Sequence, residues 1–261
     1  MTKSANPYAR TGTPIAIAHR GGGREFPENS LTAFREVVNM GYTHIETDMR
    51  ATRDGSVMIF HDANLNRVTN GVGRISELPY SEVAKAKIAG KDQIMTLQEL
   101  LEEFPDTAFN LDVKDDQTVE PFIAAMKQTQ AFDRVCVGSF SGKRLKAVRK
   151  ELGPKLATGM APSEVSLLAS ASRAGRFGAN FSDRISSSVI AAQVPIKAGR
   201  IPIVTQAFVH TAHRIGLAVH VWTIDETDQM ERLLDLGVDG IMTDRPTRLL
   251  ETMGGDTTSK A

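Results

Sequence analysis

Hydrophobic and polar positions follow two alternating patterns along most of the chain. Short apolar runs, typical of buried strands, are separated by stretches in which apolar residues recur every three or four positions, as on one face of a helix. The predicted strands are Ile15–His19, His44–Met49, Val57–His61, Ala108–Val113, Arg134–Ser139, Lys155–Met160, Ala179–Ser182, Ala218–Thr223 and Val238–Thr243. Strands that alternate with helices indicate a parallel sheet built from βαβ units.

Helix boundary signals lie between these runs. Asn29 or Ser30 is suited to cap the first predicted helix, and Gly41 to end it. Thr96 and Glu99 have the spacing of a capping box at the start of a later helix. Most of the predicted strands are therefore separated by a whole helix, as parallel crossovers require.

The second and third predicted strands are an exception, because the few residues between them are too short for a crossover of about a dozen residues. Asp54-Gly55 is a strong signal for a two-residue hairpin loop. The register that follows from such a loop places His61 opposite Asp48, and Glu46 on the same face as Asp48. We therefore expect an antiparallel hairpin that carries three titratable side chains on one face.

The other runs supply eight strands for one sheet. The predicted fold is α/β, a single TIM (β/α)8 barrel over residues 14–252, with a loose N-terminal segment at 1–13 and a flexible tail at 253–261. A doubly wound open sheet is the alternative. The stretch HRGGGREF has neither the G-x-G-x-x-G spacing nor the Lys-Ser/Thr of a P-loop, so the common nucleotide-binding fingerprints are absent.

Composition narrows the class of protein. Lys and Arg total 31 and Asp and Glu also total 31 in 261 residues, which argues against a nucleic-acid partner and against stable membrane association. The single cysteine, Cys136, excludes a disulfide framework. No apolar run has the length of a signal peptide or approaches the ~20 residues of a membrane span. We expect a soluble, cytoplasmic protein; the pattern carries no information on its oligomeric state.

Polar residues gather where the predicted barrel strands end, which is where TIM barrels have their active sites. The first strands supply His19, Arg20, Glu46, Asp48, His61, Asp112 and Lys114, and later strands end at Ser139-Phe140, Asn180, Trp222-Thr223 and Thr243-Asp244. Three carboxylates suit a hard divalent cation such as Mg²⁺ or Ca²⁺. The two histidines suit general acid–base catalysis, and Arg20 and Lys114 suit an anionic group. Together these groups predict a metal-assisted enzyme that acts on a phosphate ester.

The chain resembles the glycerophosphodiester phosphodiesterase family from about residue 14 to about residue 250. The motifs that carry the resemblance are IAHRGGGREFPENSLTAF, HIETDMRATRDGSVMIFHDANLNRVTNGVGRISEL, LDVK, VWTID and DGIMTDRP. The resemblance implies a TIM barrel with a small insertion at about 63–88 and hydrolysis of glycerophosphodiesters to sn-glycerol 3-phosphate and an alcohol. It also implies the roles of individual residues: Glu46, Asp48 and Asp112 on the cation, His19 and His61 as the catalytic pair, and Arg20 and Lys114 near the phosphate.

Some positions have two interpretations or depart from the family pattern. Glu28 either balances a helix dipole or orients His19 or Arg20, the role that the resemblance favours. Trp222 and Phe140 either pack in the barrel or form a pocket wall for the glycerol or alcohol group. The family usually has glutamate where this chain has Asp112, whose side chain is one methylene shorter. The departures at Val68, in place of threonine, and Met95, in place of proline, do not touch the predicted chemistry.

Two other functions fit the same motifs. One is a phospholipase D-like lyase on the same barrel, with an internal hydroxyl as nucleophile; the single cysteine and the complete PEN motif argue against it. The other is a phosphodiester-binding barrel that has lost its catalysis. The complete set of His19, His61, Glu46 and Asp48 argues against this function, whereas the substitution at Asp112 leaves it open.

Overall fold

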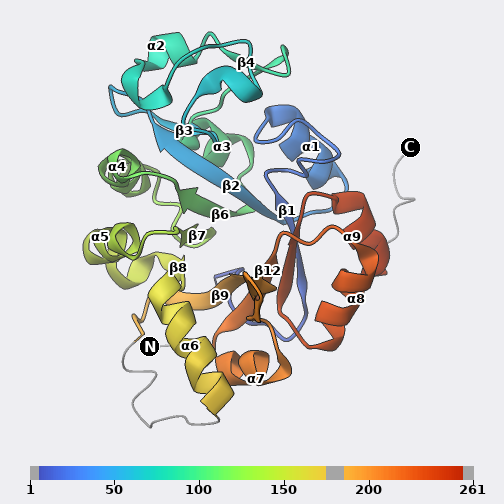
Figure 1. The fold of residues 1–261 in the computed structure, drawn as a ribbon. Coiled ribbons are helices and arrows are strands. Elements are labelled where there is room, and N and C mark those ends of the chain that lie inside the picture. Colours follow the sequence, from blue (N-terminus) through green and yellow to red (C-terminus); the bar gives the residue numbers. More distant parts are fainter. Residues whose placement is uncertain (1–5, 175–184, 255–261) are drawn as a thin grey trace.

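The structure is a computed structural model that describes residues 6–174 and 185–254 (Figure 1). A closed parallel barrel has the strand order β1-β13-β12-β9-β8-β7-β6-β2, and β1 pairs with β2 to close it. Its strands are β1 (Ile15–His19), β2 (His44–Ala51), β6 (Ala108–Val113), β7 (Val135–Gly138), β8 (Ala157–Gly159), β9 (Val189–Pro195), β12 (Ala218–Trp222) and β13 (Gly240–Thr243). The TIM-barrel prediction is confirmed, and the open sheet is excluded.

Helices surround the barrel (Figure 1). They are α1 (Leu31–Asn39), α3 (Leu97–Glu103), α4 (Val119–Thr129), α5 (Gly142–Leu152), α6 (Pro162–Ala174), α7 (Gln206–Arg214), α8 (Thr227–Asp235) and α9 (Pro246–Thr252). Ser30 caps α1, because its hydroxyl accepts a hydrogen bond from the amide of Ala33. Thr96 and Glu99 form the predicted capping box at α3. Within the described residues, no helix is long and apolar enough to cross a membrane.

One barrel strand lies where the sequence analysis placed none. The predicted strand Ala179–Ser182, with Asn180, falls outside the described residues, and the barrel position between β8 and β12 is filled by β9, Val189–Pro195. This strand carries Gln193 and ends at Pro195. A proline within an apolar run argues against a central strand, because proline cannot donate a backbone hydrogen bond. Its terminal position allows Pro195, because a strand end need not continue the ladder of hydrogen bonds.

The hairpin forms as predicted, but its register does not. β2 pairs with β3 (Val57–Ile59) so that Met49 lies opposite Ile59, and the amide of Phe60 donates to the carbonyl of Asp48 at 2.9 Å. Phe60, rather than His61, is therefore the neighbour of Asp48. His61 lies beyond the end of the strand.

The loop itself explains the shift. It spans three residues instead of two, because the amide of Thr52 donates to the carbonyl of Ser56 at 2.9 Å and Gly55 adopts φ +88°. A three-residue loop with a left-handed final residue is a common hairpin alternative. The Asp54 carboxylate accepts from the hydroxyl of Thr52 at 2.6 Å and from the amide of Tyr80 at 2.9 Å, and these two contacts hold the longer loop.

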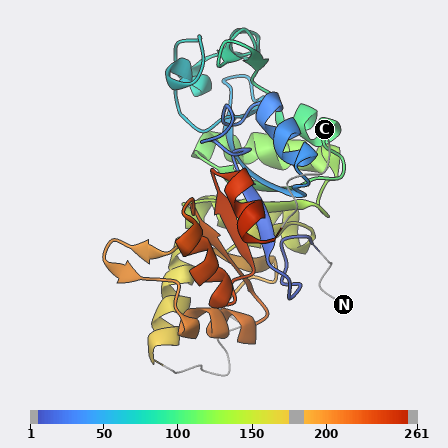
Figure 2. The same cartoon turned by 90° about the vertical axis from the view of Figure 1, so that its right-hand side faces the viewer.

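The segment predicted as an insertion lies beyond one edge of the barrel, at the top of the view in Figure 2. It contains the short elements η1 (Leu65–Arg67), η2 (Ile75–Glu77), α2 (Tyr80–Val83) and β4 (Lys87–Ile88), and β5 (Asp92–Gln93) lies just after it. It has a hydrophobic cluster of its own, to which β3 contributes Met58. Because Met58 belongs to this cluster, β3 packs against the insertion just before the chain reaches His61.

The opposite end of the barrel is closed by residues predicted to be loose. Tyr8 is fully buried, and its hydroxyl lies 2.9 Å from the carbonyl of Ile45 and 3.0 Å from that of Ala108. The amide of the Asn6 side chain donates to the carbonyl of Val135 at 3.0 Å. At least this part of the segment 1–13 is packed against the barrel, because an aromatic ring fills the space between the strand ends.

Candidate active site

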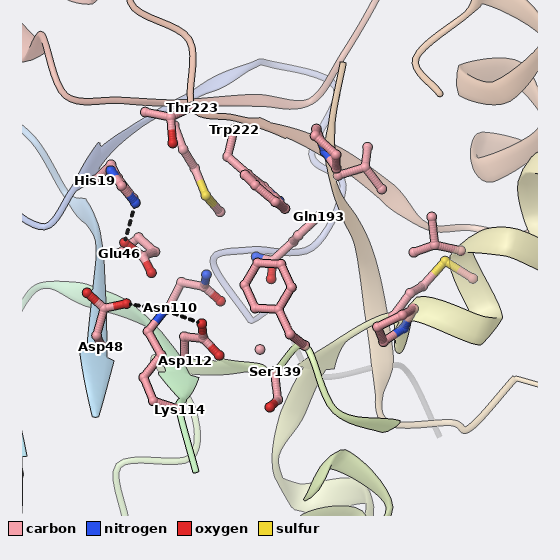
Figure 3. Close-up of a pocket in the computed structure, with 18 of the residues that line it drawn as sticks. His19, Glu46, Asp48, Asn110, Asp112, Lys114, Ser139, Gln193, Trp222 and Thr223 are labelled. Atoms are coloured by element: carbon pink, nitrogen blue, oxygen red, sulfur yellow. Dashed lines mark hydrogen bonds and ion pairs between the residues drawn. The ribbon is translucent and has the colours of Figure 1, made fainter. Parts of the chain in front are cut away.

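A cavity of about 420 Å³ opens at the carboxyl ends of the barrel strands (Figure 3). Of the predicted site residues, all but Glu28 line it: His19, Arg20, Glu46, Asp48, His61, Asp112, Lys114, Phe140 and Trp222. Glu28 lies one contact away, because its carboxylate is 3.2 Å from Nη1 of Arg20. The barrel therefore brings together residues that lie far apart in the sequence.

Two neighbouring strands supply the carboxylates. Glu46 and Asp48 point the same way from β2, and Asp112 on β6 pairs in register with Asp48. All three side chains are buried. The ammonium group of Lys114 lies 2.7 Å from Oδ1 of Asp48 and 2.7 Å from Oδ2 of Asp112, so it bridges the two strands.

Burial and neighbouring charges shift the pKa values of the β2 carboxylates in opposite directions. Burial raises the pKa of Glu46 to about 7, and the negative charge of Asp48 adds to this increase. Burial also disfavours ionised Asp48, but Lys114 and Arg20 outweigh that effect and lower its pKa. Asp48 is therefore the more readily ionised member of the pair, and Glu46 binds a proton more readily than an ordinary glutamate.

The carboxylates were also predicted to hold a cation. Across the described residues, no three His, Cys, Asp or Glu side chains are arranged as a ready metal site. The donor chemistry nevertheless fits one, because Oε2 of Glu46 and Oδ1 of Asp112 are buried without a hydrogen-bond partner. Buried carboxylate oxygens without partners are costly, and a hard cation would satisfy them.

His19 is held between two acids. Its Nδ1 lies 2.7 Å from Oδ1 of Asp244, and its Nε2 lies 3.6 Å from Oε2 of Glu46 on the pocket side. Burial lowers the pKa of His19, but the charges of Glu46 and Asp244 outweigh burial, so the net shift is upward. Asp244 orients the ring so that Nε2 faces the cavity.

His61, which also lines the cavity, has a similar arrangement. Its Nδ1 lies 2.7 Å from Oδ1 of Asp62. The guanidinium of Arg67 contacts Asp62 at 2.6 Å and also forms two hydrogen bonds with Glu28, at 2.7 and 2.8 Å. Hydrogen bonds from Arg67 lower the pKa of Asp62 to about 2, which keeps this carboxylate ionised beside His61.

Arg20 and Asn29 contact Oδ2 of Asp48, whereas Lys114 contacts its Oδ1. Arg20 adopts φ +54°, and its Nε lies 3.2 Å from Oδ2 of Asp48. The side-chain amide of Asn29 donates to the same oxygen at 3.0 Å, and its carbonyl accepts from the hydroxyl of Thr47 at 2.7 Å. Asn29 is therefore a support for Asp48 rather than the cap of α1.

An aromatic pair forms part of the rim. The rings of Phe140 and Trp222 meet edge to face, with their centroids 5.5 Å apart, and Lys114 Nζ lies 5.7 Å from the centre of the Phe140 ring. Phe140 is 67% exposed, so core packing does not account for it.

Sequence reasoning assigned no role to several residues of the site. Asp244 and Asp62 lie in motifs that carry the family resemblance. Asp62 contacts its neighbour His61 within one motif, so its position in the sequence was a signal for it, whereas Asp244 contacts His19 from a motif 225 positions away. Asn110 also lines the cavity. It precedes Asp112 by two residues, and residues two apart on a strand point to the same side, so this spacing alone indicated that Asn110 faces the cavity. Gln193, which also lines the cavity, lies on the strand that the sequence analysis missed.

The barrel, with its polar cavity at the carboxyl ends of the strands, places the chain among TIM-barrel enzymes. The model of the glycerophosphoryl diester phosphodiesterase family matches residues 19–248. The chain therefore belongs to this family, which confirms the resemblance and the class of enzyme predicted from the motifs.

Individual relatives span nearly the whole chain. A protein of Mycobacterium tuberculosis named as a probable glycerophosphodiester phosphodiesterase is 36% identical over 94% of this chain and 93% of its own length. A glycerophosphodiester phosphodiesterase of Caldanaerobacter subterraneus is 30% identical over 90% of this chain and 96% of its own. Among solved structures, an Oleispira antarctica phosphodiesterase in complex with sn-glycerol 3-phosphate has a TM-score of 0.76 and 22% identity, covering 93% of this chain and 98% of that one.

Proposed function

We propose that this chain hydrolyses glycerophosphodiesters to sn-glycerol 3-phosphate and an alcohol. The observation that carries the proposal is the pair of histidines, each with its Nδ1 2.7 Å from a carboxylate, on the wall of one cavity with the carboxylates of β2 and β6. The names of the two bacterial relatives at 30% identity or more support the same reaction.

We propose that Glu46, Asp48 and Asp112 hold one divalent cation, Mg²⁺ or Ca²⁺. When bound, such an ion stabilises the negative charge that develops on the phosphoryl oxygens. The side chains of Lys114 and Arg20 line the same cavity and bind the anionic phosphate. Glu28 holds the guanidinium of Arg20 in place through its contact with Nη1. Both cations contact Asp48 in the structure, so phosphate and Asp48 share them.

The histidines then divide the proton transfers. One histidine is neutral and takes a proton from the attacking water. The P–O bond to the alcohol breaks, and the other histidine, which is protonated, donates its proton to the leaving oxygen. Asp244 and Asp62 accept from Nδ1–H of His19 and His61 and leave Nε2 of each ring toward the cavity. We assign the walls of the glycerol or alcohol subsite to Trp222 and Phe140.

The test is to incubate the purified protein with several glycerophosphodiesters, with and without EDTA, and to couple glycerol 3-phosphate to its dehydrogenase. We expect turnover that EDTA abolishes and that Mg²⁺ or Ca²⁺ restores. A cyclic phosphate product would instead establish a lyase, and the absence of any product with any added metal would establish a binding barrel. Full activity after exhaustive chelation would remove the cation from the proposal.

Variants at Asp112 test the third ligand separately. Asp112→Asn removes a charge and should weaken cation affinity by about 10- to 100-fold, whereas Asp112→Glu retains the charge and should remain active. Cation titrations of both variants measure the difference. Equal affinity in the wild type and in Asp112→Asn would place the third ligand elsewhere.

A further inference from the structure

Two side-chain amides line the cavity with hydrogen-bonding atoms that are not used. Among the residues that the structure describes, Oδ1 of Asn110 and Nε2 of Gln193 are buried and have no hydrogen-bond partner. The Asn110 residue as a whole is only 4% exposed. By contrast, the hydroxyls of Ser139 and Ser166, which also line the cavity, donate to backbone carbonyls at 2.8 and 2.9 Å. Buried polar atoms without partners are rare and costly, so the two amides indicate a site for a polar group.

The strands place both amides at the inner end of the cavity. Asn110 lies on β6 two residues before Asp112, so it points the same way from a position nearer the amino end of the strand. Gln193 lies on β9 two residues before Pro195, which also lines the cavity. Because the cavity opens at the carboxyl ends of the strands, both amides lie deeper in the barrel than the residues that follow them.

Two glycines leave room for the side chain of Gln193 to cross the barrel. A Cβ atom at Gly159 on β8 would lie 2.7 Å from Oε1 of Gln193, and one at Gly138 on β7 would lie 3.6 Å from the same oxygen. The side chain therefore extends past β8 to β7, and β7 pairs with β6 at Asn110. Figure 3 shows the side chains of Asn110 and Gln193 directed into the same space.

A single hydroxyl group matches both amides. A hydroxyl donates one hydrogen bond and accepts others, so it can accept from Nε2 of Gln193 while it donates to Oδ1 of Asn110. A methylene group in the same place can do neither. We infer that Asn110 and Gln193 bind one hydroxyl of the glycerol arm and make the site selective for diesters that carry this hydroxyl. The inference rests on the proposed function and adds two specificity-determining residues to its site.

The surroundings of the amides favour the glycerol arm over the alcohol arm. The proposed substrates share a glycerol arm of three carbons, whereas their alcohol arms differ and need the open side of the cavity, where Phe140 is 67% exposed. Lys114, which we assign to the phosphate, contacts Asp112 at 2.7 Å. Asn110 precedes Asp112 by two residues, roughly 7 Å along the strand, a separation that the short arm and the side chains can span.

Three substrates test the selectivity. They are glycerophosphocholine and the phosphocholine diesters of propane-1,2-diol and propane-1,3-diol, each of which lacks one hydroxyl of glycerol. The measurement is the release of choline with Mg²⁺ or Ca²⁺ present. We expect one of the two analogues to have a kcat/KM about 10- to 100-fold below that of glycerophosphocholine, because it leaves both buried amides without their partner. That analogue identifies the bound hydroxyl.

Variants of the amides locate the contact. Gln193→Met and Asn110→Leu replace each amide with an apolar side chain of similar size. The measurement is the ratio of kcat/KM between glycerophosphocholine and the poor analogue within each variant, so a general loss of activity does not affect it. We expect this ratio to fall at least about fivefold in both variants. Gln229→Met is the matched control, because Gln229 is exposed on α8 and does not line the cavity.

Calorimetric binding supplies a measurement that does not depend on turnover. The ligands are glycerol 3-phosphate and the monophosphates of the same two diols, with the divalent cation present. This comparison separates recognition of a hydroxyl from any part that the hydroxyl takes in the reaction. We expect the same hydroxyl to increase affinity in the wild type and in Gln229→Met, and to have a smaller effect in Gln193→Met and Asn110→Leu.

Selectivity that falls in both amide variants but not in Gln229→Met would support the inference. Equal kcat/KM values for the three substrates in the wild type would overturn it and leave the proposed function standing. Selectivity that both amide variants retain would also overturn it, because the hydroxyl would be bound elsewhere. No hydrolysis of any substrate would refute the proposed function, and the affinities would then decide the inference: equal affinities for the three monophosphates would overturn it.

Discussion

Replacing Asp244 with asparagine should lower kcat by about 10- to 100-fold while leaving the barrel folded. In the structure this carboxylate lies 2.7 Å from Nδ1 of His19, and the opposite nitrogen of the ring faces Glu46 and the cavity. A hydrogen bond to a charged group contributes about 1.5–3 kcal/mol, and each 1.36 kcal/mol is a factor of ten in rate. The variant retains a hydrogen-bonding side chain of nearly the same size but removes the charge.

The same change has a predicted effect on pH dependence. Burial lowers the pKa of His19, and the charges of Glu46 and Asp244 outweigh burial to raise it. Without the charge of Asp244 the pKa must fall. The limb of the kcat/KM profile that reports His19 should therefore move to lower pH, whether His19 acts as the base or as the acid.

The assay is steady-state hydrolysis of a glycerophosphodiester across the pH range, with thermal unfolding measured on the same samples. Asp228→Asn, at an exposed aspartate in the first turn of α8, is the control for loss of one negative charge. If Asp244→Asn kept kcat within twofold of the wild type and left both limbs of the profile in place, the orientation of His19 by Asp244 would not contribute to the reaction.

Three further predictions concern other parts of the molecule. Because the pKa of Glu46 is about 7, protons compete with the divalent cation for this carboxylate. The affinity for the cation should therefore fall by about tenfold per pH unit below pH 7; equal cation affinities by calorimetry at pH 5.5 and pH 8 would contradict this. His61→Ala and His19→Ala should each cost about 10²–10⁴ in kcat, and with a nitrophenol leaving group one of them should recover much of that loss; equal losses on good and poor leaving groups would refute the division into acid and base. Tyr8→Phe should cost about 1–3 kcal/mol of stability, because the single hydroxyl proton that the buried carbonyls of Ile45 and Ala108 share is lost; an unchanged melting temperature by calorimetry would show that the barrel end does not depend on this hydroxyl.

The sequence by itself determined the local elements and much of the chemistry. Periodicity and caps predicted the strands and helices around Ser30 and Thr96, because these signals act over a few residues. The carboxylates on β2 share a face because side chains alternate along a strand. The strand ends then located most of the cavity, because the carboxyl ends of parallel barrel strands lie at one rim.

The tertiary structure decided the contacts between distant segments. The hairpin register depends on a loop that Asp54 holds through the amide of Tyr80, a residue in the insertion, and local turn preferences contain no information on that contact. The position of β9 likewise follows from its two neighbours in the closed barrel, because both of its edges are paired there.

The partner of His19, and the ion pair that supports the partner of His61, also required the fold. Asp244 is 225 positions away from His19 in the sequence, and Arg67 reaches Glu28 across 39 positions. Such pairs form only when barrel closure brings β13 beside β1, and when the insertion packs against β3. Sequence patterns specify which side chains a segment presents, whereas the packing of the segments specifies which side chains meet.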